Sequence, residues 1–88
     1  MSIVKQKIEA GATVVDVRSA EEFRDGGYPG AVNIPLDALA SRLHELPKDK
    51  PVVLYCASGA RSGVAARHLK RSGFTDVVNA GGLFDMPR

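Results

Sequence analysis

The chain has 88 residues, of which 44% are hydrophobic and 25% charged, and its formal net charge is +2 at pH 7. These values are typical of one soluble globular domain; they exclude a disordered chain and leave no room for a second domain. A nucleic-acid-binding protein would carry a stronger basic stripe with interleaved aromatic residues. No apolar run approaches the roughly 20 residues that cross a bilayer, so we expect neither a nucleic acid nor a membrane as partner.

The cysteine count and the first residues bear on the cellular compartment. A single cysteine cannot form an internal disulfide, so nothing indicates an oxidising compartment. The N-terminus lacks the apolar stretch of a signal peptide, which favours a cytoplasmic location. The alternative is a periplasmic protein whose signal peptide has been removed.

The first part of the chain predicts a helix, a strand and a second, short helix. Residues 2–10 carry apolar side chains at helical spacing, and Gly11 is suited to end a helix. The β-branched run 13–17 predicts a buried strand. Ser19 and Glu22 fit the capping-box pattern, in which each side chain bonds the other's backbone, so a short helix should follow.

The middle of the chain predicts two strands separated by a helix. Glycine and proline mark residues 25–30 as a loop, and residues 31–34 form a short strand before a proline. Leucines recur at helical spacing over residues 36–46, which predicts an amphipathic helix packed on a sheet. After the polar turn 47–51, the apolar run 52–55 predicts the third strand.

The last part predicts a long helix, a strand and a terminal loop. The helix is expected over residues 60–72 and the strand over residues 76–79, with residues 80–88 as loop. The side chains that the helix should bury on one side are Val64, Ala65, His68 and Leu69. Strands alternating with helices predict the α/β class: a small parallel β-sheet with helices on both faces.

Cys56 is the most informative residue, because it lies where the third strand ends and a loop of small residues leads into the long helix. Ligands of such sheets bind outside the carboxyl ends of the strands. Loop amides and the positive end of a helix dipole favour an anion there. We therefore expect the pKa of Cys56 to lie below the value of about 8.5 for a free cysteine, which makes the thiol nucleophilic at neutral pH.

The polar residues near Cys56 each allow a functional and a structural interpretation. Arg61 lies in the first turn of the helix, where its positive charge is unfavourable beside the positive end of the helix dipole. We therefore interpret it as a residue that binds an anion. Ser58 and Ser62 are candidate hydrogen-bond donors to a bound anion, although Ser62 could bond locally within the first turn. Arg67 and its basic neighbours further along the helix are interpreted as a solvated face.

Other polar residues are interpreted mainly as structural. Asp16 and Arg18 follow the first strand, and an ion pair between them would tie that strand to its neighbours. Glu22 is assigned to the capping box. His44 and His68 lie on separate predicted helices without a nearby partner in sequence, so we expect surface or hydrogen-bonded histidines rather than catalytic ones.

Four motifs in this order resemble the rhodanese (thiosulfate sulfurtransferase) family. They are Asp16-Val-Arg18 with Glu22-Phe23, Pro29-Gly-Ala-x-Asn33-Ile-Pro35, Tyr55-Cys56-Ala-Ser-Gly-Ala-Arg61-Ser62, and Asn79-Ala-Gly-Gly82. The resemblance covers roughly residues 9–86, and the Met86-Pro87 ending is most similar to small single-domain members associated with bacterial phage-shock proteins. It implies one rhodanese domain over residues 1–88.

The resemblance also implies an activity and a set of site residues. Cys56 would accept a sulfur atom as a persulfide, Arg61 would help to bind a small anionic donor such as thiosulfate, and no metal or cofactor would be required. The acceptor would be a thiol, cyanide or a sulfur-relay protein. The amides of the loop would come from Ala57, Ser58, Gly59, Ala60 and Ser62, and Asp16 and Arg18 would support the site.

The sequence departs from the family at two places and leaves other functions open. Gly27 stands where many relatives have a histidine, and Leu83 follows the double glycine where a tryptophan is common. One alternative is a sulfur-relay carrier loaded by a partner protein. Another is a cysteine phosphatase or arsenate reductase, whose loops resemble Cys-x5-Arg, whereas this chain has Cys-x4-Arg. A structural interaction domain is the third, in which Cys56→Ala would change nothing measurable. The enzymatic interpretation requires a Cys56 thiol that is accessible and not packed away from solvent.

Overall fold

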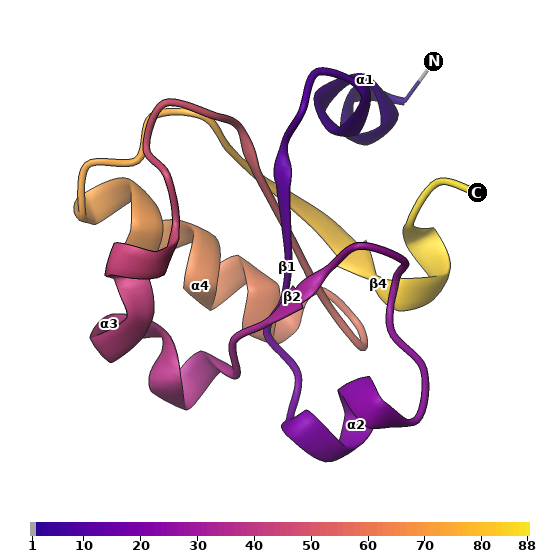
Figure 1. Cartoon of the computed structure of the whole chain (residues 1–88). Helices are drawn as coiled ribbons and strands as arrows, with labels where there is room; N and C mark the ends of the chain where they lie inside the picture. The colour runs from indigo at the N-terminus through magenta and orange to yellow at the C-terminus, as the bar shows by residue number, and fades with distance from the viewer. Residues whose placement is uncertain (1) are drawn as a thin grey trace.

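The computed structural model describes residues 2–88 and contains a four-stranded sheet in the order β2-β1-β3-β4, with every neighbouring pair parallel (Figure 1). The strands are β1 (Thr13–Asp16), β2 (Val32–Asn33), β3 (Val52–Cys56) and β4 (Val77–Gly82). The α/β class with a small parallel sheet is therefore confirmed. Met1, which the expected domain 1–88 includes, lies outside the described residues.

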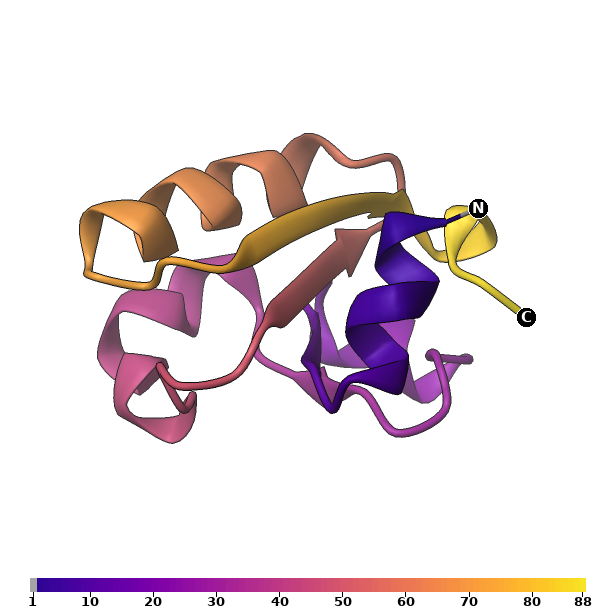
Figure 2. The same ribbon diagram turned by 90° about the horizontal axis from the view of Figure 1, so that it is seen from above.

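Helices cover both faces of the sheet, as predicted (Figure 2). On one face, α3 (Leu39–Arg42) and α4 (Ala60–Arg71) enclose the larger apolar core, which contains Cys56. On the other face, α1 (Ile3–Glu9) and the C-terminal segment enclose a smaller core, which contains Tyr55. Successive side chains of a strand point to opposite faces, so the two neighbours in β3 belong to different cores.

The two N-terminal helices begin where the sequence predicts. The hydroxyl of Ser2 accepts a hydrogen bond from the Lys5 amide at the start of α1. At the start of α2 (Ala20–Arg24), Ser19 and Glu22 form the reciprocal capping box. The capping box fixes the Glu22 side chain at the beginning of a very short helix, and this position matters for the site described below.

The leucine-rich segment is interrupted rather than one helix. It consists of a 3-10 turn η1 (Leu36–Ala38), the single turn of α3, and a second 3-10 turn η2 (Leu43–Glu45). None of the three has a side-chain cap, and the Arg42 backbone leaves helical geometry at φ −118° and ψ 12°. The Arg42 guanidinium holds Glu45 and the Asn33 carbonyl there. The prediction of a continuous helix is wrong, although its leucines do pack on the core.

The buried side of α4 also differs from the prediction. Val64 is 44% exposed, while the small residues Ser62 and Ala66 are buried beside Ala65 and Leu69. Small side chains let the helix lie close to the sheet, and this contact, rather than the apolar periodicity, sets its rotation. His68 is partly buried, but its Nε2 has no hydrogen-bond partner within residues 2–88, so the expectation of a satisfied histidine is also wrong.

The fourth strand is longer than predicted. β4 continues through Asn79 to Gly82, and a 3-10 turn, η3 (Leu83–Asp85), replaces most of the expected loop. A register shift between Leu54 and Cys56 brings Gly82 opposite Cys56. Residues 79–82 lack the apolar side chains that signal a strand, and their pairing depends instead on contact with the loop after β3.

A buried ion pair connects β1, β3 and the loop after α2. Asp16 is 0% and Arg18 7% exposed, and the guanidinium donates to both carboxylate oxygens at 2.7–3.1 Å. The Tyr55 hydroxyl donates to Asp16 at 2.7 Å and accepts from the Tyr28 amide at 2.8 Å. Arg18 also donates to the Gly26 carbonyl. The structural role proposed for Asp16 and Arg18 is therefore confirmed.

Substitution Asp16→Ala should destabilise the fold strongly. It leaves the Arg18 guanidinium buried without a counter-ion, which costs about 3–5 kcal/mol. Urea unfolding measures the change. Glu45→Ala, which breaks the exposed Arg42–Glu45 pair at 2.8 Å, is the matched control and should have a much smaller effect. Equal losses in the two variants would contradict a stabilising role for the buried network.

Candidate active site

The Cys56 sulfur lies under the loop that joins β3 to α4. Cys56 is the last residue of β3, and α4 begins at Ala60 after the N-cap Gly59. The Gly59 amide donates to Sγ at 3.0 Å, and the Ser62 hydroxyl lies 3.4 Å from Sγ. A backbone amide and a side chain from the first turn of α4 thus converge on one sulfur atom. The side chains of Ala57, Ser58 and Ala60 are exposed.

Glycine is required at two places around this loop. Gly59 has φ +99°, a left-handed conformation that other residues rarely adopt, and this conformation lets its amide face the sulfur. Gly82 of β4 lies so close that a Cβ atom there would collide with the Ala57 carbonyl oxygen. The loop therefore packs directly against the end of β4.

The environment of Cys56 favours the thiolate. Burial raises the pKa of the thiol, because the charged form loses hydration. Hydrogen bonds from the Ser62 hydroxyl and amide oppose this effect, as do those from the amides of Ser58 and Gly59. The net result is a pKa lowered from 9.0 to about 7, the direction that the sequence predicts.

Cys56 is nevertheless 0% exposed, and the expectation that the thiol is accessible is wrong. The loop closes over the sulfur, and the rest of the residue belongs to the core on the α4 side of the sheet. A cysteine buried among apolar groups alone would have a raised pKa, whereas hydrogen bonds lower the pKa of Cys56 to about 7. The burial therefore restricts the access of solvent to a thiol whose pKa is lowered.

Asn79 is a site residue that sequence reasoning missed. Its side-chain oxygen lies 2.7 Å from the Ser62 hydroxyl, whose single proton is shared between this oxygen and the Cys56 sulfur at 3.4 Å. The same oxygen accepts from the Gly81 amide at 3.0 Å, and the side-chain nitrogen donates to the Gly59 carbonyl at 3.1 Å. Asn79 thus connects β4 to the N-cap of α4 and to its first turn. The signal available in the sequence was an asparagine between an apolar strand and two glycines.

Arg61 is paired with Glu22 of α2, a contact that sequence reasoning also missed. The guanidinium donates to both carboxylate oxygens at 2.7 and 3.0 Å. This bidentate contact, together with the Ser19 amide, lowers the pKa of Glu22 to about 2. The pKa of Arg61 is raised, mainly by the Glu22 hydrogen bond and to a smaller extent by the charge of a Cys56 thiolate. Arg61 is therefore paired with a carboxylate and also interacts electrostatically with Cys56.

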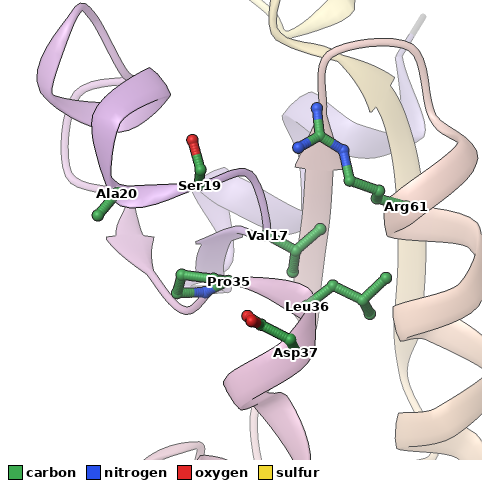
Figure 3. A pocket seen from close by; sticks show the side chains of 7 residues that line it. All are labelled: Val17, Ser19, Ala20, Pro35, Leu36, Asp37 and Arg61. Carbon is green, nitrogen blue, oxygen red and sulfur yellow. The ribbon is translucent and has the colours of Figure 1, made fainter.

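A hollow of about 610 Å³ lies beside Arg61 (Figure 3). Its lining residues are Val17, Ser19, Ala20, Pro35, Leu36, Asp37 and Arg61. In the close-up, Asp37 and Arg61 lie at opposite ends of the hollow, with Leu36 and Val17 between them. Val17 belongs to the same apolar core as Cys56, so the hollow is on the Cys56 side of the sheet.

The other residues singled out from the sequence lie away from the sulfur. Asp16 and Arg18 form their network with Tyr55, on the face of the sheet opposite the core that contains Cys56. They do not line the hollow. A Cβ on Gly27 would lie 2.6 Å from the Phe23 ring, so a side chain at this position would require that ring to shift.

Neither a membrane segment nor a metal cluster is found in the part of the chain that the structure describes. No helix within residues 2–88 has the length and apolar character needed to span a bilayer. The same residues hold no group of three or more histidine, cysteine, aspartate or glutamate side chains placed to bind a metal ion.

Comparisons with known proteins agree on one family. Residues 1–85 match the family described as the rhodanese-like domain. The chain is 39% identical over 77 residues to the putative sulfur carrier protein YrkF of Bacillus subtilis, covering 85% of this chain and 42% of that protein. It is 40% identical over 74 residues to the thiosulfate sulfurtransferase PspE of Escherichia coli, covering 82% and 71%.

A solved structure described as a rhodanese with anions from Escherichia coli has a similar fold. The TM-score is 0.81 at 38% sequence identity, and the match covers 88% of this chain and 95% of that one. The chain therefore spans nearly the whole of that structure but less than half of the sulfur carrier.

Ser62→Ala should raise the pKa of Cys56 above about 7, because the thiolate loses the hydroxyl that hydrogen-bonds it. The rate of iodoacetamide alkylation against pH reports this pKa, and the midpoint of the curve should move to higher pH. Ser72→Ala removes a hydroxyl at the far end of α4, where it bonds the His68 carbonyl, and should leave the midpoint unchanged. A midpoint near 8.5 in the unmodified protein would contradict the assigned hydrogen bonds.

Proposed function

The chain belongs to the family of rhodanese-like domains, and from this membership we propose that it is a sulfurtransferase in which Cys56 carries the transferred sulfur as a persulfide. The observation that carries the assignment to Cys56 is the set of hydrogen bonds on its sulfur, which holds the pKa at about 7. Half of the thiol is then ionised at neutral pH. A thiolate is the form that attacks sulfur.

In the first half-reaction, the Cys56 thiolate attacks the outer sulfur of a donor such as thiosulfate. A bond forms between Sγ and that sulfur while the bond to the sulfonate sulfur breaks, and the electron pair leaves on sulfite. The product is a Cys56 persulfide, and no external oxidant or reductant takes part. The amides of Gly59 and Ser58 would then stabilise the negative charge of the persulfide, as an oxyanion hole stabilises oxygen.

In the second half-reaction, a thiophile attacks the outer sulfur of the persulfide. Cyanide would yield thiocyanate, and a thiol would yield a new persulfide on the acceptor; in both cases the Cys56 thiolate leaves. Two half-reactions through one covalent intermediate predict ping-pong kinetics. The chemistry needs no cofactor, because sulfur itself is the carried group.

The remaining site residues receive roles from their positions. Arg61 would attract the anionic donor, since its guanidinium borders the hollow and lies near the sulfur. The loop residues Ala57, Ser58, Gly59, Ala60 and Ser62 would surround the transferred sulfur. Asp16 and Arg18 would act indirectly, by holding the strand ends beneath the site.

Thiosulfate is the donor proposed here, and a protein donor is the second candidate. The first is supported by the relative PspE, whose name specifies thiosulfate. The second is supported by the relative YrkF, a putative sulfur carrier, and by the 0% exposure of Cys56, which a docked partner could relieve by shifting the loop. Both candidates use the same persulfide on Cys56.

A phosphatase or arsenate reductase activity is less well supported by the loop. Only four residues separate Cys56 from Arg61, and the amides and hydroxyl of this short loop converge on the sulfur itself. A tetrahedral phosphate or arsenate would require a wider loop. The match to rhodanese-like domains supports sulfur transfer instead.

Incubation with thiosulfate should add the mass of one sulfur atom to the protein, and cyanide should remove it with release of thiocyanate. Intact-mass spectrometry measures both steps, and Cys56→Ser should show neither. Faster loading from a cysteine desulfurase than from thiosulfate would favour the relay function. Hydrolysis of a phosphate ester without any sulfur adduct would reject sulfur transfer.

A further inference from the structure

The Glu22–Arg61 pair places a carboxylate against the cation that borders the Cys56 site. We propose that Glu22 is a specificity-determining residue, which weakens the attraction of Arg61 for highly anionic donors such as thiosulfate and so reduces their advantage over donors of lower charge. This inference rests on the proposed function in naming sulfur donors, but the charge selectivity of Cys56 can be measured without sulfur transfer.

Glu22 is fixed in place before any donor arrives. Its Oε1 accepts from the Ser19 amide at 3.0 Å and from Arg61 at 2.7 Å, and its own amide is capped by the Ser19 hydroxyl at 3.2 Å. The second oxygen accepts from Arg61 at 3.0 Å. The carboxylate is thus held by α2 and presents both oxygens to the guanidinium, so an incoming anion has to compete with a preorganised ligand of Arg61.

The charges around the hollow support a selective role. Asp37 and Arg61 are the charged residues among those that line it, and Glu22 adds a second negative charge beside Arg61. Two carboxylates and one guanidinium leave a formal balance of −1. A dianion in this hollow would therefore be attracted by Arg61 and by the amides and dipole at the start of α4, while Glu22 and Asp37 oppose that attraction.

The Glu22–Arg61 ion pair should contribute little to the stability of the fold. The side chains of Arg61 and Glu22 are 38% and 36% exposed, and exposed ion pairs contribute little to folding stability. Arg61, however, also interacts electrostatically with Cys56, which contributes to the raised pKa of the guanidinium. A charge change at Glu22 should therefore alter which reagents reach the sulfur more than it alters the stability of the domain.

The test compares two alkylating reagents of similar shape, the anion iodoacetate and the uncharged iodoacetamide. The ratio of their second-order rate constants with Cys56 reports charge selectivity, because the thiolate fraction cancels from it. Glu22→Gln removes the charge but keeps a side chain that serves in a capping box, so the fold of α2 is retained. Glu21→Gln, on the same helix and without an ion pair among residues 2–88, is the matched control.

Glu22→Gln should raise the iodoacetate-to-iodoacetamide ratio by roughly threefold to tenfold at low ionic strength, and added salt should reduce the gain. Glu21→Gln should leave the ratio close to that of the unmodified protein. An unchanged ratio in Glu22→Gln, or equal changes in the two variants, would overturn the proposal.

Persulfide formation from thiosulfate separates this proposal from the proposed function. If thiosulfate loads sulfur on Cys56, Glu22→Gln should accelerate the loading by a similar factor, and failure to do so would overturn the selectivity proposal alone. If the alkylation ratio shifts but no variant gains sulfur from any donor, charge selection by Glu22 is supported and the sulfurtransferase assignment fails.

Discussion

The close approach of the end of β4 to the loop after β3 is the constraint on which the site depends. Gly82 lies opposite Cys56 and against the Ala57 carbonyl, where no side chain fits. Asn79 bonds the last residue of the same loop, Gly59, and Ser62 in the first turn of α4. With the loop held in this way, its amides point at one sulfur atom and their dipoles are already oriented when the thiolate forms.

The sheet separates this chemistry from the interactions that stabilise the domain. Cys56 faces the core beneath α4, whereas its neighbour Tyr55 faces the buried Asp16–Arg18 pair. The charges of that pair satisfy each other on the far side of the strands. Changes in the ionisation of the thiol therefore take place beside loop amides and Arg61, without disturbing the buried network.

Patterns that arise from neighbours in sequence were predictable. The capping box of α2, the order of strands and helices, and the position of Cys56 at a strand end all follow from local spacing, and the structure agrees with them.

Interactions between distant segments were not predictable. The Glu22–Arg61 pair joins residues 39 positions apart, and the strand character of residues 79–82 depends on contact with the loop rather than on their own side chains. The burial of Ser62 in place of Val64 likewise depends on how closely α4 approaches the sheet.

The closed position of the loop has a consequence for oxidative damage. Cysteines are converted stepwise to sulfenic, sulfinic and sulfonic acids when their thiolates meet dissolved peroxide, and the last two steps are essentially irreversible. Cys56 combines a thiolate at neutral pH with 0% exposure, so peroxide in solution has no direct path to it. The loop over the sulfur thus protects the Cys56 thiol from oxidation, to which its lowered pKa would otherwise make it sensitive.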